Sequence, residues 1–273
     1  MIGMTRSLGY FTDVALRRQE GSDVQVRADC TVVRSPANPT FWWGNFLLMP
    51  ALPAPGDLEA WEATFQREFP GAAHRVYGVD APGLALSGPP AEEFRAAGYD
   101  VRADTVLTAA RTHEPRRINR DAQLRVLTGD TDWAAALAMR EAVNAADPHP
   151  HEAQGYRAFA ARKLAAYRAA QAAGHGALLG AFDDHGRMLS GLGIFDAGDG
   201  VARYQNVETH PDARSRGLAG TLVPHAGEWA REHLHARTLV IVADPDYHAQ
   251  RLYESVGFTP TELQIALEKR PLE

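Results

Sequence analysis

The sequence predicts an α/β protein of two halves, each a mixed, largely antiparallel sheet flanked by helices. Short apolar and β-branched runs, typical of strands, alternate with segments that have apolar residues at helical spacing. The first half also repeats the end of the second half in shortened form. The chain has 273 residues, of which 45% are hydrophobic. This length suffices for one large core or two modest ones, at about 100–200 residues per domain.

The second half has the clearer pattern. We expect a strand, two helices separated by a polar loop, three antiparallel strands joined by tight turns, a helix, a strand, a short helix ended by Gly257, and a last strand. These elements are Leu124–Leu127, Asp130–Asn144, Gln154–Ala173, Ala177–Phe182, Met188–Phe195, Ala202–Thr209, Leu218–His235, Thr238–Ala243, His248–Val256 and Gln264–Leu267.

The first half carries a shorter run of the same kind. Phe41–Met49 is expected to be a buried strand, and its residues Phe46–Met49 open a run of strand, helix, strand, helix and strand. The expected elements are Phe46–Met49, Leu58–Phe69, Arg75–Val79, Ala91–Ala97 and Val101–Ala109.

An alignment of Gly98-Tyr99 with Gly257-Phe258 relates the two halves. It sets Phe94 opposite Tyr253, and the loop at residues 53–57 opposite the loop at residues 214–220. We therefore interpret the chain as a diverged internal duplication, with domains at 1–118 and 122–270. The charged segment Thr112–Asp121 is the expected linker.

Composition excludes several classes of protein. With 28 Lys+Arg against 34 Asp+Glu, the net charge of -6 argues against a nucleic-acid partner. The single Cys30 forms neither an intrachain disulfide nor a Cys-type metal site, which favours a reducing, cytoplasmic location. The amino terminus lacks the uninterrupted apolar stretch of an export signal. The uncharged stretch Ser35–Gly56 contains five prolines, so we expect no membrane span there.

The most informative stretch follows the strand that ends at Thr209. It reads Arg214-Ser215-Arg216-Gly217-Leu218-Ala219-Gly220-Thr221 and opens a helix. Small residues let backbone N–H groups approach an anion, and the helix start adds unsatisfied donors and a positive dipole end. The loop therefore suits a phosphate or pyrophosphate. It lacks both the P-loop pattern and the three-glycine dinucleotide fingerprint.

Arg214-x-x-Gly217-x-Ala219, placed after this strand, resembles the pyrophosphate-binding motif of the GNAT superfamily of acyl-CoA N-acyltransferases. Ala249–Phe258 resembles the second signature of that family, and the element order around both motifs agrees. The resemblance covers about Ala122 to Arg270. The first half looks like the degenerate repeat of tandem members.

The resemblance implies acetyl-CoA as cosubstrate and a set of residues that bind it. In the strand, Val207 and Thr209 would pair through their backbone with the pantetheine arm. Asp246 stands where many members have an Asn that contacts CoA, which departs from the family pattern. The expected CoA-binding residues are Val207, Thr209, Arg214, Ser215, Arg216, Gly217, Ala219, Gly220, Thr221 and Asp246.

Two side chains are candidates for catalysis. Tyr253 matches the tyrosine that protonates the departing CoA thiolate, with local packing as the alternative. Glu208 is a candidate general base for the amine, either directly or through water, with a solvated strand residue as the alternative. An irregularity in the strand near Asn206–Glu208 would present a backbone N–H to the thioester carbonyl.

The loop between the first two helices of the second half holds Asp147, His149, His151 and Glu152, where the resemblance places acceptor-binding residues. The two histidines lack a third ligand at fixed spacing, so we expect no metal. The sequence thus predicts an N-acetyltransferase that moves an acetyl or short acyl group from acyl-CoA to a primary amine by direct attack. The acceptor is expected to be a small-molecule or peptide amine. The alternative is a non-catalytic acyl-CoA sensor or interaction module.

Overall fold

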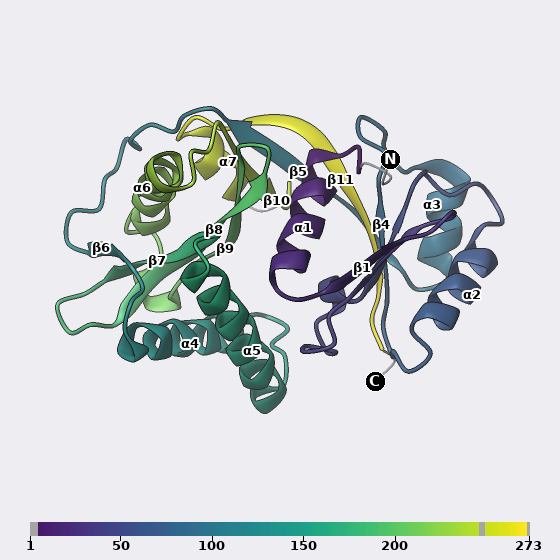
Figure 1. Cartoon of the computed structure of the whole chain (residues 1–273), viewed down its shortest axis with the longest axis horizontal. Helices are drawn as coiled ribbons and strands as arrows, with labels where there is room; N and C mark the ends of the chain where they lie inside the picture. Colours follow the sequence, from purple (N-terminus) through teal and green to yellow (C-terminus); the bar gives the residue numbers. More distant parts are fainter. Residues whose placement is uncertain (1–4, 246–248, 272–273) are drawn as a thin grey trace. The chain divides into compact units, whose positions relative to one another are not determined.

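The computed structural model describes residues 5–245 and 249–271, which fall into two compact units (Figure 1). The first unit holds the described residues of Met1–Val106, Val242–Tyr247 and Pro260–Glu273. The second holds those of Leu107–Ile241 and His248–Thr259. Each unit has sheet strands flanked by helices, so the predicted fold class is confirmed.

The sheet of the first unit has the strand order β1-β2-β3-β4-β11-β5. β3 and β4 are parallel, whereas β11 is antiparallel to β4, with Ile265 opposite Val79. The elements that lie wholly or mostly in this unit are α1 (Leu8–Gln19), β1 (Asp23–Val26), β2 (Thr31–Arg34), η1 (Trp42–Gly44), β3 (Phe46–Met49), α2 (Leu58–Glu68), β4 (Arg75–Val79), α3 (Gly88–Ala96), β5 (Asp100–Ala109) and β11 (Thr259–Lys269).

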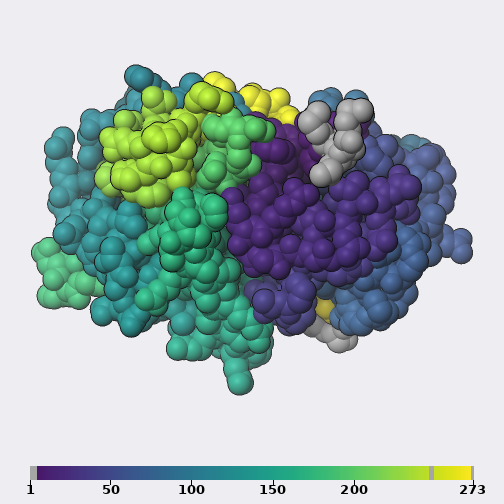
Figure 2. All heavy atoms as spheres, in the orientation of Figure 1, coloured from purple at the N-terminus to yellow at the C-terminus, as the bar shows by residue number. Residues whose placement is uncertain are grey.

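Both faces of this sheet are covered, which explains why β3 is apolar throughout. Phe46 and Leu48 pack with Tyr10 and Val14 of α1 on one face. Alternate residues of the same strand enter an aromatic cluster with α2 and α3 on the other face. The sequence pattern missed α1, β1 and β2. Figure 2 shows the amino-terminal part of the chain, in purple, forming part of the surface of the first unit on this side.

The last strand, β11, packs with the first unit because its buried residues join that unit's core. The compact units therefore divide the chain differently from the predicted domains 1–118 and 122–270 at the carboxyl end. The units reflect contacts in space, whereas the predicted domains reflect similarity along the sequence, so the duplication itself stays a prediction.

The sheet of the second unit has the order β10-β9-β8-β7-β6. Only β9 and β10 are parallel among the strand pairs whose register is described in this unit. Helices α4 and α5 lie on one side of the strands and α6 on the other (Figure 1). The elements are β6 (Gln123–Val126), α4 (Asp130–Ala145), α5 (Ala153–Ala172), β7 (Gly176–Phe182), β8 (Met188–Gly198), β9 (Val201–Thr209), η2 (Pro211–Ala213), α6 (Leu218–His233), β10 (Thr238–Ala243) and α7 (Ala249–Glu254).

Two of the expected elements need correction. The expected strand Phe41–Met49 is regular only from Phe46, because η1 and a turn precede it; the Asn45 side chain donates to the carbonyl oxygen of Phe41 at 2.8 Å and closes that turn. The segment Thr112–Asp121 is not a free linker, since it belongs to the second unit and bonds to the start of α6. His248, the first residue of the expected short helix, lies outside the described residues.

Candidate functional site

The strand β9 carries an irregularity at Asn206. On β8, Gly191 pairs with Glu208 and Gly193 pairs with Gln205, so β9 contains one extra residue between these pairs. Asn206 has a φ of 49°, and its side-chain oxygen accepts a hydrogen bond of 2.7 Å from the hydroxyl of Tyr167. A bulge leaves backbone groups unpaired in the ladder. The predicted irregularity near Asn206–Glu208 is therefore confirmed.

Glu208 follows the bulge and lies against Arg140 of α4. Arg140 Nε is 3.5 Å from Glu208 Oε2, and the two side chains are only 6% and 17% exposed. Burial raises the pKa of Glu208, and the positive charge of Arg140 offsets only part of this effect, so the pKa lies above its ordinary value. Glu208 is thus no solvated strand residue. A buried carboxyl with a raised pKa suits a general base near neutral pH.

These two side chains line a small pocket that is partly open to solvent. Its polar groups come from Arg140, Asn206, Glu208 and Tyr167. The remaining wall is apolar or small and comes from both helices and strands: Ala136, Met139, Leu164, Leu178, Met188, Gly191 and Leu192. A few converging polar groups in an apolar pocket are typical of a small-molecule site.

The predicted acceptor loop connects to this pocket through one of its histidines. The Asn144 side chain bonds both backbone groups of His151, at 3.0 and 3.1 Å, and so holds the loop to the end of α4. The His151 ring stacks on Tyr156, with centroids 6.0 Å apart. Tyr156 in turn hydrogen-bonds Arg140. The sequence analysis did not single out Arg140, although a lone arginine within an apolar helical stretch was the available signal.

The other members of that loop have local roles. Glu152 caps α5 by accepting from the backbone N–H groups of Gln154 and Gly155. Asp147 accepts from the backbone N–H of His149 at 2.9 Å. These contacts shape the loop, and their use by an acceptor stays a prediction.

The expected phosphate loop is exposed and positively charged. Arg214, Ser215 and Arg216 are exposed, and neither arginine makes an ion pair with any residue that the structure describes. Ser215 and Gly217 have left-handed backbones, with φ of 61° and 77°, and α6 begins directly after them. The first N–H groups of α6 and the positive end of its dipole therefore face an open, cationic loop.

The segment 107–121 forms hydrogen bonds with this loop and with the start of α6. The Asn119 side chain donates to the carbonyl oxygen of Arg216 at 3.0 Å, and its backbone N–H donates to the hydroxyl of Thr221 at 2.8 Å. A Cβ at Gly217 would lie 2.8 Å from the carbonyl oxygen of Arg117. Since Thr221 also donates to the Gly217 carbonyl oxygen, its hydroxyl is committed to holding the loop.

Tyr253 lies on α7 with its ring packed. The side chain is 6% exposed and meets Phe258 edge-on, with centroids 6.3 Å apart; Phe258 meets Tyr204 in the same way at 5.6 Å. Tyr253 does not line the pocket around Arg140 and Glu208. Its packing is thus evident, whereas its role as an acid stays a proposal.

The remaining expected CoA-binding positions are placed as follows. Val207 and Thr209 are half-buried on β9, and the Thr209 hydroxyl lies 3.0 Å from that of Ser190. Ala219 and Gly220 lie in the first turn of α6. Asp246 lies outside the described residues.

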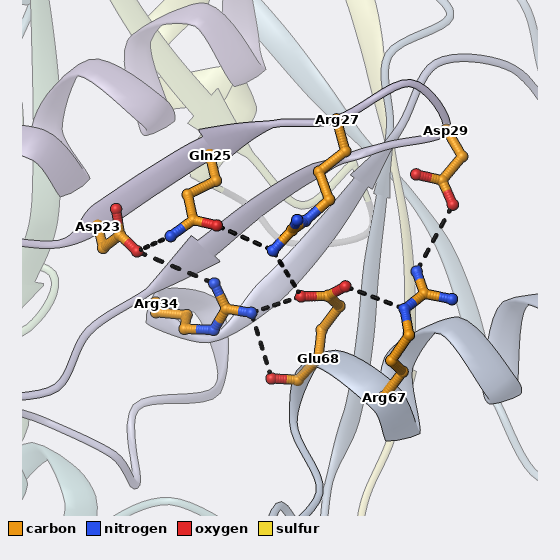
Figure 3. A network of polar contacts seen from close by, with 7 residues as sticks. All are labelled: Asp23, Gln25, Arg27, Asp29, Arg34, Arg67 and Glu68. Carbon is orange, nitrogen blue, oxygen red and sulfur yellow. Dashed lines mark hydrogen bonds and ion pairs between the residues drawn. The ribbon is translucent and has the colours of Figure 1, made fainter.

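A cluster of arginines in the first unit is structural. Arg27, Arg34 and Arg67 all bond the carboxylate of Glu68 (Figure 3). Burial acts to raise the pKa of Glu68, but the hydrogen bonds from Arg67 and Arg34 outweigh it and the pKa lies below its ordinary value. Because their charges meet a carboxylate, these arginines differ from Arg214 and Arg216.

Within residues 5–245 and 249–271, no group of three or more His, Cys, Asp or Glu side chains is placed to hold a metal ion. No helix in the described part of the chain is long and apolar enough to cross a membrane.

One family model matches the part of the chain that contains this site. Residues 136–258 match the model of the acetyltransferase (GNAT) family. No curated protein matches the sequence.

Three solved structures share the fold at low identity. A functionally unknown conserved protein from Staphylococcus epidermidis is 12% identical, over 92% of this chain and 95% of its own, with a TM-score of 0.70. A GCN5-related N-acetyltransferase from Kribbella flavida is 16% identical, over 96% of each chain, with a TM-score of 0.64. A tandem GNAT protein from the clavulanic acid biosynthesis pathway is 16% identical, over 79% of this chain and 68% of its own, with a TM-score of 0.52.

Proposed function

We propose, from the premise that the second half of the chain is a GNAT-family domain, that the protein is an N-acetyltransferase that moves an acetyl or short acyl group from acyl-CoA to a primary amine. The observation that supports this most is the continuity of one segment. The bulge at Asn206 and the buried Glu208 lie on β9, which leads through η2 into the cationic loop before α6. The acyl group, the amine and the pyrophosphate would thus all bind along one continuous segment of the chain.

The residues divide the chemistry between them. Glu208, directly or through water, takes a proton from the ammonium group of the acceptor, and the freed amine attacks the thioester carbonyl. A backbone N–H at the bulge stabilises the oxyanion as the C–N bond forms. The nitrogen of the tetrahedral intermediate then loses its surplus proton to solvent, the C–S bond breaks, and Tyr253 donates a proton to the CoA thiolate and regains one from solvent. Glu208 returns to its ionised form by releasing its proton to solvent. The products are an N-acyl amine and free CoA.

The test is incubation of the full chain with acetyl-CoA and a panel of primary amines, with mass spectrometry of the amines and detection of free thiol. We expect one acylated amine per thiol released. Binding of acetyl-CoA without any amine-dependent release of thiol would overturn acyl transfer and support the sensor alternative. Failure to bind acetyl-CoA would overturn both.

A further inference from the structure

The pocket contains an incompletely satisfied cation. Arg140 is 5% exposed, yet its Nε and Nη1 donate no hydrogen bond to any described residue. The nearby Glu208 carboxylate is at ion-pair distance but does not complete the hydrogen bonds of the guanidinium. A buried donor without an acceptor is destabilising, and more so on a charged group. Unsatisfied donors at a pocket wall therefore suit an anionic group that arrives from outside.

The charge balance of the pocket narrows the class of acceptor. Arg140 and Glu208 together are neutral, so a simple ammonium ion would add an uncompensated positive charge beside a buried guanidinium. An acceptor that carries both a positive and a negative group adds no net charge and gives Arg140 and Glu208 each a group of opposite charge.

The distance between Arg140 and Glu208 narrows the class of acceptor further. Arg140 Nε and Glu208 Oε2 are 3.5 Å apart, so the two charges of the acceptor must also be close together. The amine and carboxylate of an α-amino acid are separated by one carbon. The apolar wall formed by Met139, Met188 and Leu192 then suits an apolar side chain.

We propose that the acceptor is a zwitterionic α-amino acid, whose carboxylate accepts a hydrogen bond from Nη1 of Arg140 and whose ammonium group lies against Glu208. This inference rests on the acyl transfer proposed above. One ammonium proton passes to Glu208, the amine nitrogen bonds to the acyl carbon and loses its surplus proton to solvent, and the thiolate leaves. The product is an N-acyl amino acid that keeps its carboxylate on Arg140.

The experiment compares amino acids with the amines that lack only the carboxylate: alanine with ethylamine, methionine with 3-(methylthio)propylamine, and phenylalanine with phenethylamine. We expect kcat/KM to favour at least one amino acid over its matched amine by roughly 10–100-fold, as a hydrogen-bonded charge pair provides. Arg140→Met should bring that ratio close to one, and Arg140→Lys should give an intermediate ratio. Arg157→Met, which removes an exposed arginine of α5, should leave the ratio unchanged.

Equal or faster turnover of the matched amines, or a ratio that survives Arg140→Met, would overturn the zwitterion while leaving acyl transfer intact. Failure of every amine to release thiol, with acetyl-CoA still bound, would instead overturn the transfer. Calorimetry then tests the binding of the carboxylate by Arg140 separately from acyl transfer. It compares the affinities of alanine and ethylamine in the presence of CoA, and equal affinities would exclude that binding. If Arg140→Met does not fold, the test compares the kcat/KM ratio of amino acid to matched amine between the wild type and Arg140→Lys.

Discussion

The loop before α6 and the loop before α2, which the predicted alignment of the two halves sets opposite each other, differ in the surface that they present to an anion. In the second unit, Arg214 and Arg216 are exposed and no described residue neutralises them. In the first unit, the N–H of Gly56 already donates to the carboxylate of Glu93 at 2.8 Å, and the carboxylate of Asp57 accepts from Ala54 at 2.8 Å. Carboxylates of the protein therefore fill the place that a phosphate would need.

The strands that precede these two loops also differ. β3 is apolar, buried on both faces and regular in its described pairing with β2, whereas β9 has the bulge at Asn206 and the carboxyl of Glu208. Where the second unit has Tyr253, the alignment gives Phe94, which is fully buried among aromatic rings. Under the predicted duplication and the proposed function, a few local substitutions thus separate a half that is packed as a core from a half that carries a reactive site.

The largest effect should come from the hydroxyl that Phe94 lacks. Tyr253→Phe should lower kcat by roughly 10²–10⁴-fold with little change in CoA affinity, because only proton delivery is lost. Steady-state kinetics and calorimetry measure the two quantities. Tyr99→Phe is the matched control, since it removes a buried hydroxyl of the first unit that donates to Glu62 at 3.0 Å. Wild-type turnover by Tyr253→Phe would leave Tyr253 a packing residue.

The next largest effect should come from the charge of the loop. Replacing Arg214→Glu and Arg216→Glu together should weaken CoA binding roughly 100-fold, because each change turns a cation beside the phosphates into an anion. The affinity should also become less dependent on salt than in the wild type. Arg67→Ala is the control, since that arginine is engaged by Glu68. An unchanged dissociation constant in the double variant would contradict the assignment of the loop.

A smaller effect separates the two loop glycines. Gly217→Ala should destabilise the protein by about 1–3 kcal/mol, because a left-handed backbone and contact with the carbonyl oxygen of Arg117 both oppose a Cβ. Gly56 has a φ of 90° but no atom within 4 Å of an added Cβ, so Gly56→Ala should cost about 1 kcal/mol from the backbone alone. Chemical denaturation measures both. Equal losses would show that the segment 107–121 does not press on the loop.

The sequence alone predicted most helices and strands of the second unit, because its periodic elements are long and its motifs are local. The bulge near Asn206 was expected because the resemblance calls for a backbone donor there, and the strand ending at Thr209 was recognisable by its alternation. Arg140 was missed because its partner Glu208 is far away in sequence and only the packing of α4 on β9 brings the two together.

The missed elements of the first unit have a different cause. α1 reads as short apolar runs broken by charges, and its apolar residues find their partners in β3 and β4. The sequence pattern also did not reveal that β11 belongs to the first unit, since the pairing of β11 with β4 joins residues far apart in the sequence and leaves no local pattern. Contacts between distant segments, rather than local propensity, determine these features.

The last prediction is that a change in the first half has no effect on the number of CoA sites. The chain should bind one CoA, and removal of a carboxylate from the loop before α2 should not create a second site. Titration of the wild type should give a stoichiometry of one. Glu93→Gln removes the carboxylate from the N–H of Gly56, yet we expect the stoichiometry to stay at one. Pro53 and Pro55 still lack N–H donors, the loop has no arginine, and the remaining carboxylate of Asp57 repels a pyrophosphate. Two CoA per chain in either protein would refute the asymmetry, and would show that backbone geometry outweighs the missing cations.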